Sequence, residues 1–327
     1  MYLSTHLTRL SFIYFILISL FFSGITKADT PSFKRLIAFG DSLVDTGNDP
    51  AITFLQHLPD GSVVPGLVIP PPTRYDRGRF SNGPVIVDYL ATKLSGFVKP
   101  SESGFNLTKD NISYAYGGSE SGLENYTPGL FLVPGLKGQV LKFENDLNLN
   151  DLNFDKILFV VLTGANDYLN SLSQGHSPDP FKIVDNIVSS VNKLTDLGAK
   201  HVVVINLPDL GATPICQSFG ACDLLTNLTE VHNDLLASAL MDNSKVLLFD
   251  AYSVVDKILT DPDRFGFSEN IDPGPATGCL FQSPSQFNIG NCALVNFNTD
   301  SIYWDEIHPS TKVHKILARA LWRKLRD

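Results

Sequence analysis

The chain has 327 residues, of which 43% are hydrophobic and 18% are charged. This composition is typical of a folded globular protein, and the length suits one large domain of helices and strands or two small ones. The formal net charge is −9 at pH 7, which disfavours binding to nucleic acid or to an anionic lipid surface. Any contact with a membrane would then depend on apolar side chains, and we expect it to be transient.

The first 28 residues differ in composition from the rest of the chain. An apolar run over residues 12–22 follows Arg9, and small residues come after it. The run is too short to span a bilayer comfortably, so we interpret 1–28 as a secretory signal peptide rather than an uncleaved anchor. Its loss would remove Arg9 and Lys27 and no acid, which changes the formal charge from −9 to −11. No repeat or linker follows, so we expect a secreted protein with one domain over 29–327.

Apolar patterning divides the mature chain into alternating strands and helices. Continuous apolar runs predict five buried strands, at 36–39, 112–116, 157–162, 201–205 and 245–250. Apolar residues at helical spacing predict helices at 84–95, around 140–147, and at 180–197, 224–241, 251–260 and 310–325. Such alternation predicts an α/β fold with a five-stranded parallel sheet that is covered by helices on both faces.

Two apolar loops are candidates for contact with lipid. Residues 58–73 form a Pro- and Gly-rich loop whose apolar residues between 63 and 69 we expect to be exposed. A loop of this length inside a compact domain is usually functional or mobile. A second apolar segment covers residues 130–136. Exposed apolar residues in both segments would be able to meet a lipid surface.

Three of the predicted strands end at residues that suit a reactive site. Ser42 follows the first strand after Gly40, Gly118 follows the second and Asn166 the third. In an open parallel sheet the ligand crevice lies outside the carboxyl ends of the strands, so we expect these residues to converge on one rim. Gly117 adjoins Gly118, and the choice between the two glycines stays open.

A serine hydroxyl becomes a nucleophile only when a base lies within hydrogen-bond reach and a third group orients that base. Among the seven histidines, His308 stands out because Asp305 precedes it by three residues. In a turn this spacing places the carboxylate beside the imidazole. Taken alone, an Asp-x-x-His pair is more often structural, and Ser42 after a glycine is more often a helix cap.

Four blocks of sequence, in order along the whole mature chain, resemble the GDSL (SGNH) hydrolase family. They are Gly40-Asp41-Ser42-Leu43, then Gly118, then Gly164-Ala165-Asn166-Asp167, and finally Asp305-x-x-His308. Residues 78–84 and 206–211 are also similar to a secreted bacterial branch that contains lysophospholipases and glycerophospholipid–cholesterol acyltransferases. The resemblance implies a flavodoxin-like, three-layer α/β/α fold and ester hydrolysis without a cofactor.

The resemblance also implies a role for each matching residue. Ser42 would be the nucleophile, His308 the general base and Asp305 the group that orients the base. The oxyanion of the tetrahedral intermediate would be held by the backbone N–H groups of Ser42 and Gly118 and by the side-chain amide of Asn166. Fixed donors of this kind stabilise the charge that concentrates on one oxygen in the transition state.

The four cysteines lie late in the chain, at Cys216, Cys222, Cys279 and Cys292. Export would favour disulfides, and three pairings are possible. We favour Cys216 with Cys222 and Cys279 with Cys292, because each pair brackets a Gly- or Pro-rich loop. The sequence has no Cys-x-x-Cys and its histidines are scattered, so we predict no metal site.

Three functions are compatible with these sequence features. The leading prediction is a secreted serine hydrolase that acts on lysophospholipids or phospholipids through an acyl-enzyme intermediate, with cholesterol as a candidate acyl acceptor. The first alternative is a short-chain or carbohydrate acetyl esterase on the same fold. The second alternative is a secreted protein that binds lipid without turning it over.

Overall fold

The computed structural model describes residues 33–53, 68–94, 96–127, 131–147, 152–268, 276–277, 280–283, 286–287 and 299–327. Some of the predicted features lie outside the described residues. These are the signal peptide, the apolar residues between 63 and 67, and the cysteines at 279 and 292.

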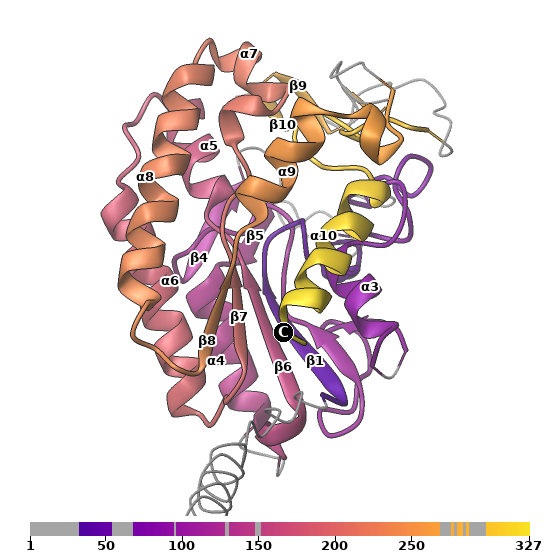
Figure 1. Cartoon of the computed structure of the whole chain (residues 1–327), viewed down its shortest axis with the longest axis vertical. Coiled ribbons are helices and arrows are strands. Elements are labelled where there is room, and N and C mark those ends of the chain that lie inside the picture. The colour runs from indigo at the N-terminus through magenta and orange to yellow at the C-terminus, as the bar shows by residue number, and fades with distance from the viewer. Residues whose placement is uncertain are drawn as a thin grey trace, which may run out of the picture.

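A six-stranded parallel sheet forms the centre of the molecule (Figure 1). Its strands in spatial order are β2 (Val98–Pro100), β3 (Asn111–Ser113), β1 (Arg35–Gly40), β6 (Ile157–Leu162), β7 (Val202–Ile205) and β8 (Val246–Phe249). Without β2, this is the strand order 2-1-3-4-5 of flavodoxin-like folds. The fold class is therefore confirmed, but the predicted number of five strands is wrong, because β2 adds a sixth strand beside β3.

The additional strand has no apolar pattern that could have revealed it. β2 has three residues, and two of them are Lys99 and Pro100. Proline is tolerated at the edge of a sheet, where its missing N–H leaves no ladder bond unmade. The neighbouring strand β3 is shorter than the predicted 112–116, although the N–H groups of Tyr114 and Tyr116 still donate to carbonyl oxygens in and at the end of β1.

Helices cover both faces of the sheet (Figure 1). One face is covered by α4 (Leu136–Leu147), α6 (Pro180–Asp196) and α8 (Cys222–Leu240), and the other by α3 (Ile86–Ala91), α9 (Ala251–Thr260) and α10 (Thr311–Lys324). Smaller elements are α2 (Asn48–Thr53), α5 (Ala165–Ser173), α7 (Ile215–Phe219), the hairpin of β4 (Glu124–Thr127) with β5 (Phe131–Pro134), and the hairpin of β9 (Phe281–Ser283) with β10 (Gln286–Phe287). The three-layer α/β/α architecture is thus confirmed.

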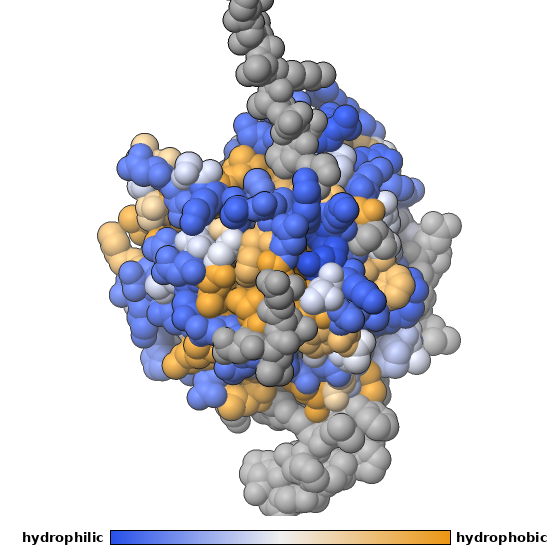
Figure 2. All heavy atoms as spheres, turned by 90° about the horizontal axis from the view of Figure 1, so that it is seen from below, coloured by the Kyte–Doolittle hydropathy of each residue, from blue (hydrophilic) through white to orange (hydrophobic). Residues whose placement is uncertain are grey.

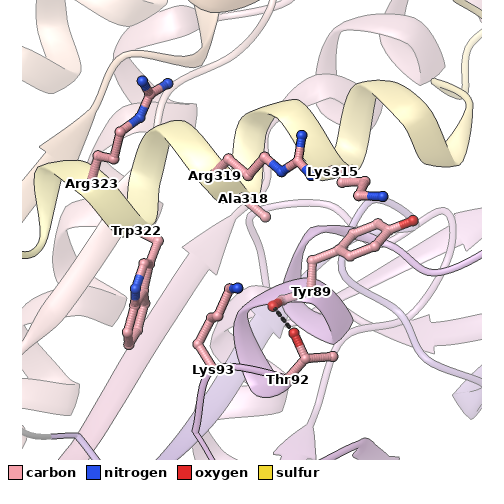
Figure 3. Close-up of a pocket in the computed structure, with 8 residues that line it drawn as sticks. All are labelled: Tyr89, Thr92, Lys93, Lys315, Ala318, Arg319, Trp322 and Arg323. Atoms are coloured by element: carbon pink, nitrogen blue, oxygen red, sulfur yellow. Dashed lines mark hydrogen bonds between the residues drawn. The ribbon is translucent and has the colours of Figure 1, made fainter.

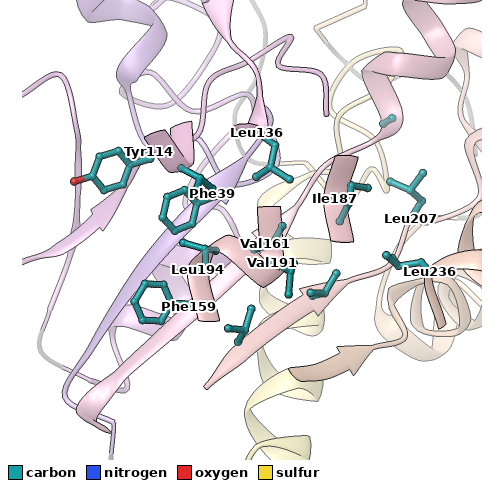
Figure 4. Close-up of a cluster of buried hydrophobic side chains, with 14 of the residues drawn as sticks. Phe39, Tyr114, Leu136, Phe159, Val161, Ile187, Val191, Leu194, Leu207 and Leu236 are labelled. Atoms are coloured by element: carbon teal, nitrogen blue, oxygen red, sulfur yellow. The ribbon is translucent and has the colours of Figure 1, made fainter. Parts of the chain in front are cut away.

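Side chains that alternate along the strands divide the core into two parts. In β6, Phe159 and Val161 pack toward α4, α6 and α8, whereas Leu158 and Val160 pack toward α3, α9 and α10. Figure 4 shows the first of these clusters, with residues from strands and helices interdigitated. Because β6 is buried on both faces, its sequence is apolar without interruption, which is why it could be predicted.

The two apolar loop segments are less exposed than the sequence suggests. Ile69 is fully buried in a cluster with Trp304, so the prediction that it is exposed is wrong. In the second segment Leu132 is 53% exposed, but Val133 and Leu136 are buried. Aromatic side chains from distant parts of the chain cover Ile69, and a local pattern cannot reveal such cover.

One end of the molecule can be inspected in a space-filling view. Figure 2 is seen from below, and hydrophilic residues surround a smaller area of hydrophobic ones there. This is the end opposite to the carboxyl ends of the strands. Among the described residues, no helix is both long enough and apolar enough to cross a membrane.

Candidate active site

Ser42 lies directly beyond β1, in a turn that only glycine at position 40 permits. Gly40 has a φ of 142°, and a Cβ there would lie 1.8 Å from the carbonyl oxygen of Leu162. The buried amide of Gln139, on α4, holds this backbone from the other side. Its Oε1 accepts from the Gly40 N–H at 2.8 Å, and its Nε2 donates to the Gly40 carbonyl at 2.8 Å. These contacts fix the path of the chain one step before Asp41 and Ser42.

Ser42 does not cap a helix, which was the structural alternative for this residue. Residues 41–44 form a turn, and the next helix, α2, begins only at Asn48. The carboxylate of Asp45 explains the delay, because its Oδ1 accepts from the N–H groups of Gly47 and Asn48 at 2.8 Å each. Asp45 thus accepts hydrogen bonds from backbone N–H groups at the start of α2.

Ser42, His308 and Asp305 lie in one line of hydrogen bonds. The Nε2 of His308 is 2.9 Å from the Oγ of Ser42, and its Nδ1 is 2.7 Å from Oδ2 of Asp305. Oδ1 of Asp305 accepts from the backbone N–H of His308 at 2.7 Å, which closes the turn predicted from the spacing. All three residues are buried. With the proton on Nδ1, the imidazole can accept the hydroxyl proton of Ser42.

Tyr75 extends this line and was not predicted. Its hydroxyl donates to Oδ2 of Asp305 at 2.6 Å, and its side chain is almost completely buried. Burial opposes ionisation of Asp305, but the charge of His308 and the hydrogen bonds from His308 and Tyr75 outweigh it and lower the pKa of Asp305. No local signal could have identified Tyr75, because it lies 230 residues before its partner.

The segment that contains Phe80, Ser81 and Asn82 holds the loop of His308. The ring of Phe80 lies 5.1 Å from the imidazole of His308, measured between centroids. The hydroxyl of Ser81 donates to the carbonyl of Pro309 at 2.9 Å. Oδ1 of Asn82 accepts from the N–H of Thr311, the first residue of α10, at 2.8 Å. The resemblance in residues 78–84 therefore has a structural reason.

Gly117 and Gly118 can now be distinguished by their contacts. The N–H of Gly117 donates to Oδ1 of Asp49 at 3.0 Å, and a Cβ on Gly117 would lie 2.2 Å from the ring of Phe80. Gly117 is therefore needed for close packing, and its N–H already has a carboxyl oxygen as its acceptor. Gly118 has a φ of 76°, a conformation that favours glycine.

Asn166 lies beside the segment of Gly118. It is the second residue of α5, and its Nδ2 donates to the carbonyl oxygen of Ser119 at 3.0 Å. Gly164 caps this helix with a φ of 117°. The structure thus brings together the segments of Gly118 and Asn166, as expected for the rim at the carboxyl ends of β3 and β6.

Three buried carboxyl groups lie in the turn of Ser42 or in the residues that follow it. Burial raises the pKa of Asp41 to about 7 and that of Asp45 to about 6. Burial and the neighbouring charge of Asp45 raise the pKa of Asp49 well above its usual value. In the described part of the chain, no group of three or more His, Cys, Asp or Glu side chains is arranged to hold a metal ion.

A narrow, largely apolar cavity opens beside Ser42. Its enclosed volume is about 40 Å³, which is room for roughly three water-sized groups. The apolar side chains that line it come from the ends of several elements, and they are Leu43, Ala165, Leu207, Pro208, Leu210, Val255, Tyr303, Ile307 and Pro309. A group attached to a reacting carbonyl at Ser42 would enter an apolar environment.

Cys216 and Cys222 form a disulfide, which is the pairing that we favoured. The bond joins α7 to the start of α8, and residues just before Cys216 touch the loop of His308. The N–H of Ile215 donates to the carbonyl of Glu306 at 2.9 Å, and the hydroxyl of Tyr303 donates to the carbonyl of Ala212 at 3.1 Å.

Comparison with known proteins identifies the class to which this site belongs. The family model described as GDSL-like lipase/acylhydrolase matches residues 36–321. Because this match covers most of the chain, the protein belongs to the GDSL lipase/acylhydrolase family. It is accordingly a carboxylic ester hydrolase.

Individual relatives are more distant. A GDSL esterase/lipase of Arabidopsis thaliana is 26% identical over 325 residues, which cover 88% of this chain and 86% of that protein. The phosphatidylcholine-sterol acyltransferase of Aeromonas hydrophila is 28% identical over 330 residues, which cover 90% of this chain and 91% of the relative. Among solved structures, an acetylxylan esterase of Geobacillus stearothermophilus has a TM-score of 0.46 and 14% identity, with 90% of this chain and 94% of the other covered.

Proposed function

We propose that this protein is a secreted serine hydrolase that releases the acyl chain of lysophospholipids or phospholipids, with one catalytic domain from residue 29 onward. Ser42 is the nucleophile, His308 the general base and Asp305 the group that orients it. The observation that carries the proposal is the 2.9 Å contact between the Ser42 hydroxyl and the imidazole of His308. The second contact, from His308 to Asp305, supports the same assignment.

The reaction follows from these contacts. His308 takes the hydroxyl proton while Oγ of Ser42 attacks the ester carbonyl, and the carbonyl electron pair moves to the oxygen. The oxyanion is held by the N–H groups of Ser42 and Gly118 and by the amide of Asn166. Collapse expels the alcohol, which takes the proton from His308 and leaves an acyl-enzyme. Water, or an alcohol such as cholesterol, then attacks the acyl-enzyme in the same way.

Lipid as substrate has two supports. The Aeromonas hydrophila relative is named for phosphatidylcholine and sterol, and it covers nearly the whole chain. The cavity beside Ser42 is lined mainly by apolar side chains, which suit the hydrocarbon part of an acyl group. Secretion is supported by the sequence of residues 1–28, and contact with the membrane would be transient.

A second candidate is a short-chain or carbohydrate acetyl esterase. The enclosed volume of about 40 Å³ beside Ser42 favours it, because a short acyl group fills such a cavity without a change in the surrounding side chains. A long chain would have to continue out of the cavity along the surface. Chain length is therefore the variable that separates the two candidates.

The test is a series of esters of increasing chain length together with lysophosphatidylcholine, assayed with and without cholesterol. The lipid proposal predicts release of fatty acid from lysophosphatidylcholine, and loss of this activity by several orders of magnitude in Ser42→Ala. A fluorophosphonate probe should label the wild type at Ser42 and leave Ser42→Ala unlabelled. Cholesteryl ester in the presence of cholesterol would indicate acyl transfer.

Two results would decide against the proposal in different ways. Rapid turnover of acetyl esters with no release of fatty acid would exclude lipid as the substrate, but the assignment as a serine hydrolase would stand. Unchanged activity in Ser42→Ala, with a fold that matches the wild type by circular dichroism, would remove the assignment of the nucleophile. Ser173→Ala is a control, since this serine ends α5 and its hydroxyl donates, among the described residues, to the carbonyl of Asn170.

A further inference from the structure

A groove between α3 and α10 lies apart from the site of Ser42. It has a volume of about 570 Å³, and its lining residues are Tyr89, Thr92, Lys93, Lys315, Ala318, Arg319, Trp322 and Arg323. Figure 3 shows these side chains on α10, on α3 and on the turn that follows α3. An α-helix rises about 1.5 Å per residue, so Arg323 lies about 18 Å along α10 from Thr311. The groove therefore runs down the flank of the molecule, away from the catalytic edge.

The charge of this groove is opposite to that of the protein. Four of its lining residues are cationic and none is acidic, although the formal net charge of the chain is −9. Lys315, Arg319 and Arg323 follow one another at intervals of four on α10, a spacing at which like charges destabilise a helix. Within the described residues, none of the four cations forms an ion pair with a carboxylate.

The acids elsewhere on these helices already have partners or lie away from the groove. Asp88, the only acid of α3, forms a two-pronged contact with Arg79 at 2.7 and 2.9 Å. Lys312, the cation of α10 nearest the site, pairs with Asp300 at 3.1 Å. The four cations that line the groove therefore have no carboxylate partner among the described residues, and an anion from outside the chain would supply their counter-charge.

We propose that this groove binds a ligand that carries a phosphate monoester. Such a group has nearly two negative charges at neutral pH and three strong acceptor oxygens, so one group can engage several cations at once. A guanidinium matches phosphate oxygens with two parallel hydrogen bonds, which suits Arg319 and Arg323. The half-buried rings of Tyr89 and Trp322 form apolar walls beside the cations, where the rest of the ligand would lie.

The same chemistry occurs in a soluble phosphate ester and in the head group of phosphatidic acid. The test therefore has two arms. In the first, the wild type is titrated with inorganic phosphate and with glycerol 3-phosphate, with chloride at matched ionic strength as the reference. In the second, the protein is sedimented with phosphatidylcholine vesicles that contain or lack phosphatidic acid. Trp322 provides a fluorescence signal in the first arm, because the second tryptophan, Trp304, is completely buried.

Two double variants with the same loss of charge are compared. Lys315→Gln with Arg319→Gln removes two groove cations, and binding should weaken by about tenfold or more, because charge-assisted hydrogen bonds are lost. Lys324→Gln with Arg326→Gln removes two exposed cations that do not line the groove, and binding should stay within about twofold of the wild type.

Lys93→Gln, on the chain that leaves α3, should weaken binding independently of α10.

Each outcome decides the proposal. Binding of glycerol 3-phosphate that is weakened only in the groove variant supports it with a soluble source, and binding only to vesicles with phosphatidic acid supports it with a lipid source. No binding above the chloride reference in either arm overturns it. Equal losses in the two double variants also overturn it, because they would indicate a response to net charge alone. The readout is binding, so it does not depend on the proposed esterase activity.

Discussion

The hydroxyl of Tyr75 is the group that closes the line of hydrogen bonds behind Asp305. Tyr75→Phe removes this donor and keeps the ring, which packs beside Phe80 and Trp304. We expect kcat to fall about tenfold with little change in KM, since a hydrogen bond to a charged group contributes about 1.5–3 kcal/mol. The measurement is the steady-state hydrolysis of a soluble ester by wild type and variant.

A matched control separates this role from a loss of packing. Tyr114 is also largely buried and donates its hydroxyl to a carboxylate, that of Asp146, at 2.8 Å, but it lies in the core under α4. Tyr114→Phe should therefore leave kcat near the wild-type value. A kcat for Tyr75→Phe equal to that of the wild type, or the same fall in both variants, would show that Tyr75 does not position Asp305.

The amide of Asn166 has two hydrogens, of which one is used in the contact with Ser119. The second is available to the oxyanion in the proposed mechanism. Asn166→Ala should lower kcat by about two to three orders of magnitude, the usual effect of the loss of one oxyanion donor. Asn170→Ala is the control on the same helix, because among the described residues the amide of Asn170 donates to Glu120. Comparable rates for Asn166→Ala and the wild type would exclude Asn166 as a donor.

At the level of elements, the disulfide between Cys216 and Cys222 holds α7, whose first residue, Ile215, contacts the loop of His308. Cys216→Ser with Cys222→Ser should lower the free energy of unfolding by about 2 kcal/mol, because the closed loop is short. We also expect kcat to fall, since Ile215 and Ala212 contact that loop. Urea unfolding and ester hydrolysis measure the two effects. An unchanged kcat at lower stability would mean that the disulfide is only a structural staple.

Elements could be predicted where burial alone dictates the sequence. β6 and β7 are apolar without interruption because both of their faces are covered. α6 follows its predicted span closely, since a buried stripe repeats along it and Pro180 stands in its first turn. β2 could not be predicted, because its three residues derive their strand conformation from the edge of β3 rather than from their own side chains.

The same distinction applies to the site. Ser42 and His308 could be predicted as site residues because each belongs to a short block whose spacing carries chemical meaning, and the structure brings their side chains within 2.9 Å. Tyr75 and Gln139 were missed. Their partners lie 230 and 99 residues away, so only the tertiary fold reveals that they hold Asp305 and Gly40.

For the molecule as a whole, several buried groups titrate far from their usual pH. Burial raises the pKa of four carboxyl groups, to about 7 for Asp41 and Asp167, to about 6 for Asp45, and well above its usual value for Asp49. The stability that these carboxyl groups contribute is complete below pH 3.8, their pKa in the unfolded chain. It is lost as the pH rises through their pKa in the folded protein. Burial lowers the pKa of His232 to about 4 and that of His314 to about 3. Their contribution is present above pH 6.5 and is lost as the pH falls.

These opposite signs predict the pH dependence of unfolding. Above about pH 6.5 the unfolded histidines no longer bind protons, so only the carboxyl groups act and the free energy of unfolding should decrease as the pH rises toward about 8. Asp49→Asn replaces a buried carboxyl by an amide of the same shape, and Oδ1 can still accept from Gly117. The variant should show a shallower decrease, by at most about 1.4 kcal/mol per pH unit, the value for one proton.

The measurement is urea unfolding of wild type and variant from about pH 5 to about pH 8. Asp155→Asn serves as the control, because Asp155 is exposed and its hydrogen bond and ion pair with Lys200 lower its pKa. Ionisation of Asp155 therefore affects the free energy of unfolding only below pH 3.8. Above pH 5, the free energy of unfolding of Asp155→Asn should change with pH as it does in the wild type. If Asp49→Asn and the wild type have the same slope, Asp49 ionises in the folded protein as easily as in the unfolded chain. Asp45 and Asp49, which lie buried beside Gly117, would then both be charged in the folded protein, next to the packed ring of Phe80.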